Sequence, residues 1–201
     1  MTTKSFLLGA ALALTTAGAA NAADWVVTMG ARATIAPPYE GAASEVVRPF
    51  PTLSARRADR PYRFTPPDGG TTFAVIDTDH FVMGPMARFQ YQREPQGLLK
   101  GLDKVKSAIE PGVFVEVWPA NWLRGRVEAR RGIAGHDGFV GDVGVDLVYT
   151  GRRWDASIGG RAGWGDDNYM DKYFGVTTRE AARSPVINQV YNPSSGRRYG
   201  G

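Results

Sequence analysis

The sequence predicts an all-β fold in which antiparallel strands form a transmembrane β-barrel of the outer membrane. Three observations favour this fold over a soluble β-sandwich, whose strands also alternate polar and apolar residues. The alternating runs are about ten residues long, close to the ~9–11 residues that a tilted strand needs to cross a bilayer, whereas strands commonly have ~5–6 residues. Aromatic residues lie at the ends of the apolar face, as in the girdles of outer-membrane barrels. The opposite face carries several charges per strand, which a barrel interior can hold.

The first 22 residues have the features of a signal peptide. Lys4 supplies a positive charge, residues 6–14 form a short apolar run, and Ala20-Asn21-Ala22 has the small-x-small form of a cleavage site. No later apolar run approaches the ~18 residues of a membrane-spanning helix, which excludes a polytopic helical membrane protein. We expect export, removal of residues 1–22, and a single barrel domain over residues 23–201.

The clearest alternation lies in three consecutive runs, over residues 123–130, 139–149 and 154–164. Successive side chains of a strand point to opposite faces, so one face of each run is small or apolar and the other is polar. The residues predicted to face the barrel interior are Arg124, Arg126, Glu128, Arg130, Asp142, Asp146 and Arg161. The residues predicted to form aromatic girdles are Phe139, Tyr149, Trp154 and Trp164.

The other strands are less sharply patterned. Candidate strands cover residues 25–35, 46–56, 62–65, 71–77, 81–93 and 109–118, which brings the expected number to about nine. Residues 97–105 are expected to form a polar loop, and residues 169–183 a long loop with one helical turn at most. Because periplasmic turns are short, a periplasmic turn at 150–153 would place the long segment 165–184 on the extracellular side.

Composition and motifs argue against several functions. The chain has no cysteine, so no disulfide can stabilise it. Its net charge of +4 falls to +3 when Lys4 is removed with the signal peptide, which is too small to indicate a nucleic-acid partner. His80 and His136 lack the spacing of a metal site, and Asp166, Asp167 and Asp171 lack that of an EF-hand. We expect no cofactor.

An enzyme is not indicated either. Ser157 lies outside any G-x-S-x-G motif and on the polar face of its strand, so a hydrolase is only a third interpretation. The charged ladder at residues 124–130 has two readings. It could line a selective pore for small solutes, or it could fill a small barrel with mutually paired charges.

Several motifs resemble the MltA-interacting protein (MipA/OmpV) family of outer-membrane proteins. They are Trp25-Val26-Val27-Thr28-Met29-Gly30, Pro38-Tyr39-Glu40-Gly41, Arg48-Pro49-Phe50-Pro51, Phe81-Val82-Met83-Gly84-Pro85, Glu110-Pro111-Gly112, Asp167-Asn168-Tyr169-Met170 and Tyr173-Phe174-Gly175-Val176-Thr177. The resemblance implies a barrel in contact with outer-membrane lipid. It also implies a scaffold whose partners are a lytic murein transglycosylase and a peptidoglycan synthase.

The sequence departs from this family at its end. Family members continue through further strands to a C-terminal aromatic residue, whereas this sequence ends at Tyr199-Gly200-Gly201. Nine strands is also an odd number, while bacterial single-chain barrels have even numbers. Either the C-terminal strands are missing from this sequence, or the barrel has an open edge whose backbone groups would be unpaired in lipid. We expect that the strands are missing.

Overall fold

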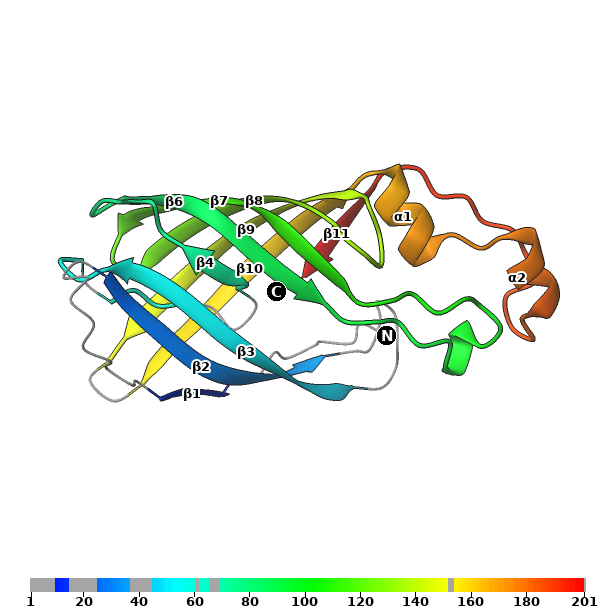
Figure 1. The fold of residues 1–201 in the computed structure, drawn as a ribbon, viewed down its shortest axis with the longest axis horizontal. Coiled ribbons are helices and arrows are strands. Elements are labelled where there is room, and N and C mark those ends of the chain that lie inside the picture. The colour runs from blue at the N-terminus through cyan, green and yellow to red at the C-terminus, as the bar shows by residue number, and fades with distance from the viewer. Residues whose placement is uncertain are drawn as a thin grey trace.

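A computed structural model describes residues 10–14, 25–36, 45–60, 62–65, 69–151 and 154–200 (Figure 1). Within them the chain is predominantly β. The strands are β1 (Ala10–Leu14), β2 (Trp25–Ala36), β3 (Val46–Arg57), β4 (Thr71–Phe73), β5 (Ile76–Asp77), β6 (Phe81–Gln90), β7 (Ala108–Ala120), β8 (Leu123–Arg131), β9 (Phe139–Thr150), β10 (Asp155–Gly165) and β11 (Gly196–Gly200). The helices are η1 (Gly97–Leu99), α1 (Asp167–Phe174) and α2 (Thr178–Arg183).

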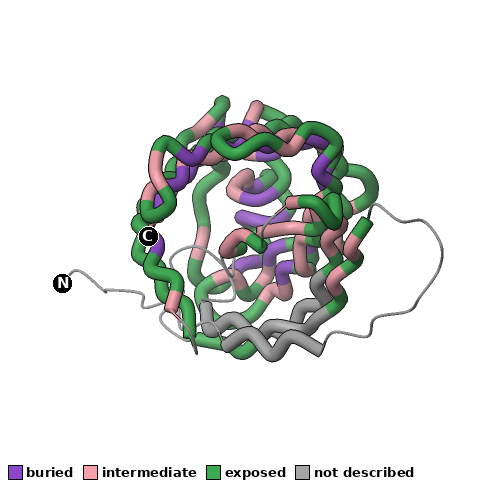
Figure 2. The backbone as a smooth tube through the Cα atoms, turned by 90° about the vertical axis from the view of Figure 1, so that its left-hand side faces the viewer, coloured by how far each residue is buried: buried purple, intermediate pink, exposed green. Residues whose placement is uncertain are grey.

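The strands form one barrel-like sheet. Its order is β1-β2-β3-β4-β6-β7-β8-β9-β10-β11, with β5 paired to β6 beside this path. Viewed along its length, the sheet curves into a ring around an interior (Figure 2). Among the described residues no pairing joins β11 to β1 or β2, so the ring is not closed by hydrogen bonds.

The predicted all-β, mainly antiparallel fold is confirmed, with four differences. The expected strand over residues 62–65 does not form, and the expected strand over 71–77 is divided into β4 and β5. The pairing of β4 with β3 is parallel, through Ser54 with Thr72 and Ala55 with Phe73. The described strands number eleven rather than nine, because β1 and β11 were not expected. The predicted signal peptide contains β1 and stays a prediction.

The register of the central strands places charged residues side by side. Arg124 on β8 lies opposite Asp146 on β9, and Glu128 lies opposite Asp142. On the other side of β8, Arg126 lies opposite Glu116 of β7. Directly opposed residues in an antiparallel pair share a face, so these charges meet on one surface of the sheet.

The distribution of burial along these strands is the reverse of that in a soluble protein. Arg124 and Asp146 are only 2% and 1% exposed, whereas Val145 and Ile158 are 51% and 74% exposed. The outer face of these strands is therefore apolar, and the inner face holds their buried charges beside apolar side chains such as Phe114 and Val148.

The two ends of the sheet differ in the length of their connections. The turns after β7 and β9 lie at one end and are short, although residues 152 and 153 are outside the described part. The connections after β6, β8 and β10 lie at the other end, where the longest are residues 91–107 and 166–195 (Figure 1). These two segments are called the end cap below. The cap therefore lies opposite the turn at 150–153.

Residues 169–183 are not the loop that the sequence predicted but contain most of two helices. Asp166 begins α1 by accepting a hydrogen bond from the Tyr169 amide at 2.9 Å. Thr177 and Glu180 form a capping box at the start of α2. Each cap satisfies amides that a helix start leaves without partners, which lets short helices form in a segment without strong periodicity. No helix in the described residues is long and apolar enough to cross a membrane.

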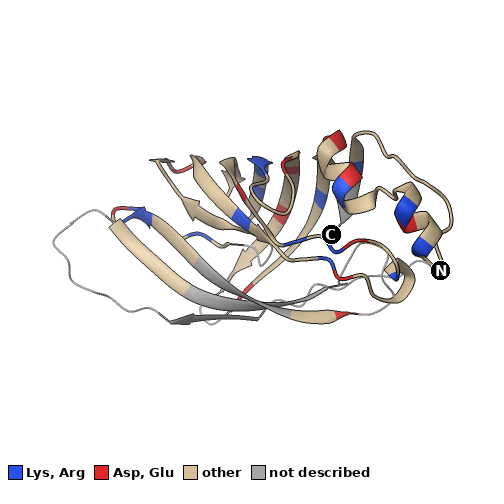
Figure 3. Cartoon of the chain, turned by 45° about the vertical axis from the view of Figure 1, so that its right-hand side comes forward, with Lys and Arg blue, Asp and Glu red and all other residues tan. Residues whose placement is uncertain are grey.

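The end cap is held together by small apolar clusters and by ion pairs. Tyr169 and Tyr173 of α1 pack on Val140 at the start of β9. Ala181 of α2 packs with Leu102 from the other cap segment. The charges of α1 and α2 can be followed in Figure 3.

One carboxylate on each cap segment links the two. Asp103 accepts from Arg179 at 2.9 Å and from Arg183 at 2.7 Å, and Glu180 accepts from the amide of Asp103 at 2.7 Å. The hydrogen bonds from Arg183 and Arg179 lower the pKa of Asp103. Burial by itself raises the pKa of Glu180. Hydrogen bonds from the Thr177 hydroxyl and from the amides of Asp103 and Thr177 lower this pKa by more, so the net shift is downward.

We expect the end cap to loosen in acid. Both folded-state pKa values lie below the unfolded values of about 4, so this stabilisation is present above about pH 4 and is lost as the pH falls through the folded pKa values. Hydrogen exchange, corrected for its intrinsic pH dependence, should rise in residues 91–107 and 166–190 between pH 5 and pH 3. Glu180→Gln should weaken this acid response. The matched control is Glu94→Gln, which removes an exposed cap carboxylate paired to Lys104 and should leave the response intact. If Glu180→Gln kept the full acid response, the Glu180 carboxylate would not be one of its causes.

Candidate functional site

The inner face of β6 to β10 carries a continuous network of ion pairs. In the described residues it contains five arginines and five carboxylates, so the side chains are balanced in charge. They are Arg88, Arg124, Arg126, Arg130, Arg161, Glu110, Glu116, Glu128, Asp142 and Asp146. All seven residues that the sequence predicted to face the interior belong to this network.

Asp146 is the centre of one part of the network. Its two carboxylate oxygens accept from Arg124 at 2.6 Å and from Arg161 at 2.7 Å. Arg124 continues to Glu116 at 2.6 Å, and Glu116 also accepts from the indole of Trp118 at 2.6 Å. The glycine opposite Asp146, Gly159, makes this possible, because a Cβ there would lie 2.2 Å from the Asp146 carboxylate.

Glu128 is the centre of the other part. It accepts from Arg126 at 2.6 Å and from Arg88 at 2.9 Å, and it also pairs with Arg130. Arg126 also donates to Glu116 at 3.0 Å and so joins the two parts. A fold can bury charged groups in this way only when they are paired and hydrogen-bonded, because an unpaired buried charge is strongly destabilising.

The network ends beneath the cap. Arg130 donates to Glu110 at 2.9 Å, and the Nε2 atom of His136 lies 3.0 Å from the other Glu110 oxygen. The imidazole ring of His136 packs edge-on against Tyr169 and Tyr173 of α1, with centroid distances of 5.2 and 5.5 Å. Helix α1 therefore covers the end of the ion-pair network.

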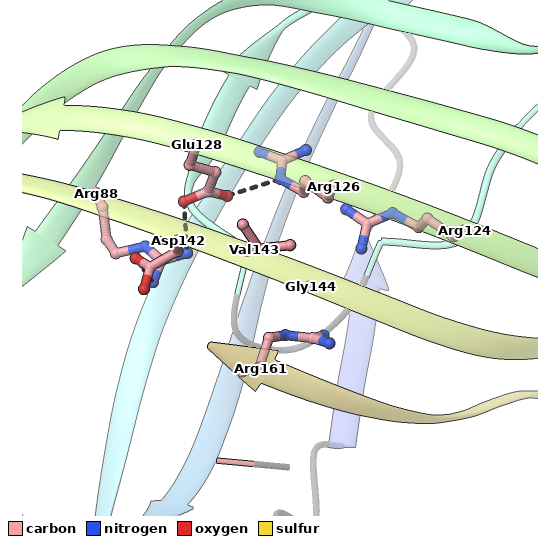
Figure 4. Close-up of a pocket in the computed structure, with 9 residues that line it drawn as sticks. Arg88, Arg124, Arg126, Glu128, Asp142, Val143, Gly144 and Arg161 are labelled. Atoms are coloured by element: carbon pink, nitrogen blue, oxygen red, sulfur yellow. Dashed lines mark hydrogen bonds and ion pairs between the residues drawn. The ribbon is translucent and has the colours of Figure 1, made fainter. Parts of the chain in front are cut away.

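A cavity of about 100 Å³ opens within the network (Figure 4). Its charged lining is contributed by β6, β8, β9 and β10. The lining side chains are Arg88, Arg124, Arg126, Arg161, Glu128 and Asp142. Gly69, from the segment between β3 and β4, also lines it, so this segment reaches the interior of the barrel.

The predicted girdle residues lie on the exposed outer surface near the two ends of the strands. Tyr149 and Trp154 adjoin one short turn, with ring centroids 5.0 Å apart. Phe139 and Trp164 lie at the cap end of β9 and β10. The structure adds aromatic residues that the sequence did not single out, namely Trp25, Trp122 and Phe89.

Sequence reasoning missed Arg88, Glu110 and Glu116 as members of the network, and His136 as the side chain that contacts its end. The first three occupy even positions of runs that alternate, so the rule applied to residues 123–164 would have found them in residues 81–118. His136 carried no such signal, because it follows β8 in an irregular connection.

The residues weighed for metal binding or catalysis do not assemble. The described part of the chain contains no group of three or more potential metal ligands. The Nδ1 atom of His80 lies 2.8 Å from the carbonyl oxygen of Trp118, and His136 contacts Glu110. Neither histidine hydrogen-bonds to a serine within the described residues. Ser157 lies opposite Val148 and so on the inner face of β10, as the sequence indicated.

Comparison with known proteins gives one family. The family described as MltA-interacting protein MipA matches residues 29–201, which is most of the chain. No curated protein matches the chain at a significant level, and no solved structure does.

Proposed function

The chain belongs to the MltA-interacting protein MipA family, and we propose that it is an outer-membrane β-barrel that acts as a scaffold for enzymes of murein turnover. The partners proposed are a lytic murein transglycosylase, in line with the family name, and a peptidoglycan synthase. The protein itself is proposed to have no enzymatic role. Family membership over residues 29–201 is the observation that carries the scaffold role.

The inverted burial pattern supports the location in a membrane. Val127, Val143, Val145 and Leu147 each expose about half of their surface, while their neighbours Glu128 and Asp146 are buried. Exposing this apolar area to water would cost ~25 cal/mol per Å², whereas lipid removes that cost. Strands that are apolar outside and polar inside are typical of transmembrane barrels.

The balanced network favours a filled interior over a pore. Each of its five guanidinium groups is within ion-pair distance of at least one carboxylate, and α1 lies over one end. A small-solute pore is the second candidate, supported by the cavity among Arg88, Arg126 and Asp142. Planar-bilayer recordings separate the two, because a filled barrel should show no resolvable channel steps.

We propose that the end cap faces the cell exterior, because short connections are periplasmic in such barrels. Protease added to intact cells should then cut the connection between α2 and β11, residues 184–195. Cleavage seen only after the outer membrane is permeabilised would place the cap in the periplasm.

Capture of a transglycosylase tests the scaffold role. The tagged chain, folded in detergent, should retain a purified lytic murein transglycosylase and release it when the barrel is unfolded in urea. An unrelated barrel with the same tag serves as the control. Equal retention by both barrels, or retention by neither, would overturn the proposal. Channel steps without retention would favour the pore.

A further inference from the structure

The cavity in the ion-pair network has an excess of positive groups around it. Four guanidinium groups and two carboxylates line it, contributed by residues on β6, β8, β9 and β10 (Figure 4). The carboxylates that balance the remaining charge, Glu116 and Asp146, belong to the network but do not line the cavity. A solute inside the cavity would therefore meet mainly arginine side chains.

Hydrogen-bond donors also outnumber acceptors there. Each guanidinium has five N–H groups and no acceptor. Arg88 donates to Glu128 through Nη2, and Arg124 donates to Asp146 and Glu116 through Nη1 and Nη2. The Nε atoms of Arg88 and Arg124 are buried and have no hydrogen-bond partner. Glu128 already accepts from Arg88, Arg126 and Arg130, so it has little capacity for more donors.

Gly144, which lines the cavity, leaves room there for the Arg161 side chain. A Cβ atom at Gly144 would lie 3.2 Å from Cδ, Nε and Nη1 of Arg161, so a side chain there would press against this arginine. The cavity of about 100 Å³ is large enough for several water-sized groups, which is the size of a small oxyanion and far below that of a sugar chain.

We propose that this cavity binds one small oxyanion, either a tetrahedral ion such as phosphate or the carboxylate of a small solute. Arginine forks match both groups, because two parallel N–H groups meet two oxygens and the hydrogen bonds are assisted by charge. The oxygens of the anion would accept hydrogen bonds from guanidinium N–H groups that do not donate to a carboxylate. This proposal does not depend on the scaffold role.

Calorimetric titration of the full chain, folded in detergent micelles, tests the site. Inorganic phosphate and acetate are titrated separately, with chloride at the same ionic strength as the reference. We expect one site per chain for at least one of the two oxyanions and no saturable heat with chloride. The preferred oxyanion distinguishes a tetrahedral ion from a carboxylate. Absence of saturable binding for both would overturn the proposal.

Matched arginine variants place the site. Arg88→Gln should weaken binding at least about tenfold, the loss expected when one charge-assisted contact is removed. This variant should fold, because Arg88 is partly exposed and Glu128 keeps Arg126 and Arg130. Arg63→Gln is the control, since Arg63 pairs with Asp77 outside the cavity lining, and it should leave the affinity unchanged.

The two variants decide the location together. Equal affinity in Arg88→Gln and the unaltered chain would show that the anion binds elsewhere. An equal loss in Arg63→Gln would show a general effect of net charge. Either result would contradict a site in this cavity.

Discussion

Replacing Asp146 with asparagine is expected to lower the free energy of unfolding in lipid vesicles by about 3 kcal/mol, the lower part of the range for breaking a buried ion pair. Asp146 is buried and accepts from both Arg124 and Arg161. The neutral amide cannot offset the charge of two guanidinium groups in the interior. Arg124 still has Glu116, which keeps the loss below the maximum.

Two further variants control this result. Asp155→Asn changes an exposed aspartate at the start of β10 and should shift stability by no more than about 0.5 kcal/mol. The double variant Asp146→Asn with Arg161→Gln should cost less than the sum of its single changes, because both members of one pair are removed. Strict additivity would show that the two side chains do not interact in the folded barrel.

Replacing Val145 with arginine is expected to destabilise the inserted barrel by ~2–4 kcal/mol, the cost of a cation at the bilayer midplane. Val145 is the neighbour of Asp146 in the middle of β9 but lies on the opposite, outward face. The penalty should fall toward the ends of the strand, since it depends on depth. Unfolding from lipid vesicles in urea measures both effects on the same scale.

Val145→Leu controls for the change in side-chain size. It keeps an apolar group on the outer face and should leave stability nearly unchanged. If Val145→Arg were as stable as Val145→Leu, the outer face of β9 would not be in contact with hydrocarbon.

Strand identity and face could be predicted wherever the alternation is unbroken. Every second residue is charged in β8, and Asp142 and Asp146 occupy the corresponding face of β9. The structure places Arg124 and Asp146 opposite each other on the inner face. The same rule covers Glu110 and Glu116, but Pro111 and Gly112 weaken the strand signal in β7. Periodicity therefore indicates the face of a residue more reliably than the extent of its strand.

Features that depend on distant contacts could not be predicted. Strand β4 has only three residues, and its parallel pairing with β3 depends on residues far away in the sequence. Both α1 and α2 depend on capping side chains and on packing against Val140 and Leu102, and their length is too short for a periodic pattern. Charges at the same spacing could equally have lined an open channel. Only the pairing distances show that every arginine of the network is paired with a carboxylate.

The most direct test of the account is the environment of matched aliphatic positions along β9. The chain has no cysteine, so single cysteines can carry a nitroxide label without other changes. Val143, Val145 and Leu147 face outward, whereas Val140 and Val148 are buried on the inner face. In lipid vesicles we expect the outward labels to collide readily with oxygen and poorly with a water-soluble nickel complex, and the inward labels to show lower oxygen accessibility. Outward labels that collide freely with the nickel complex would place that face in water and contradict the membrane barrel.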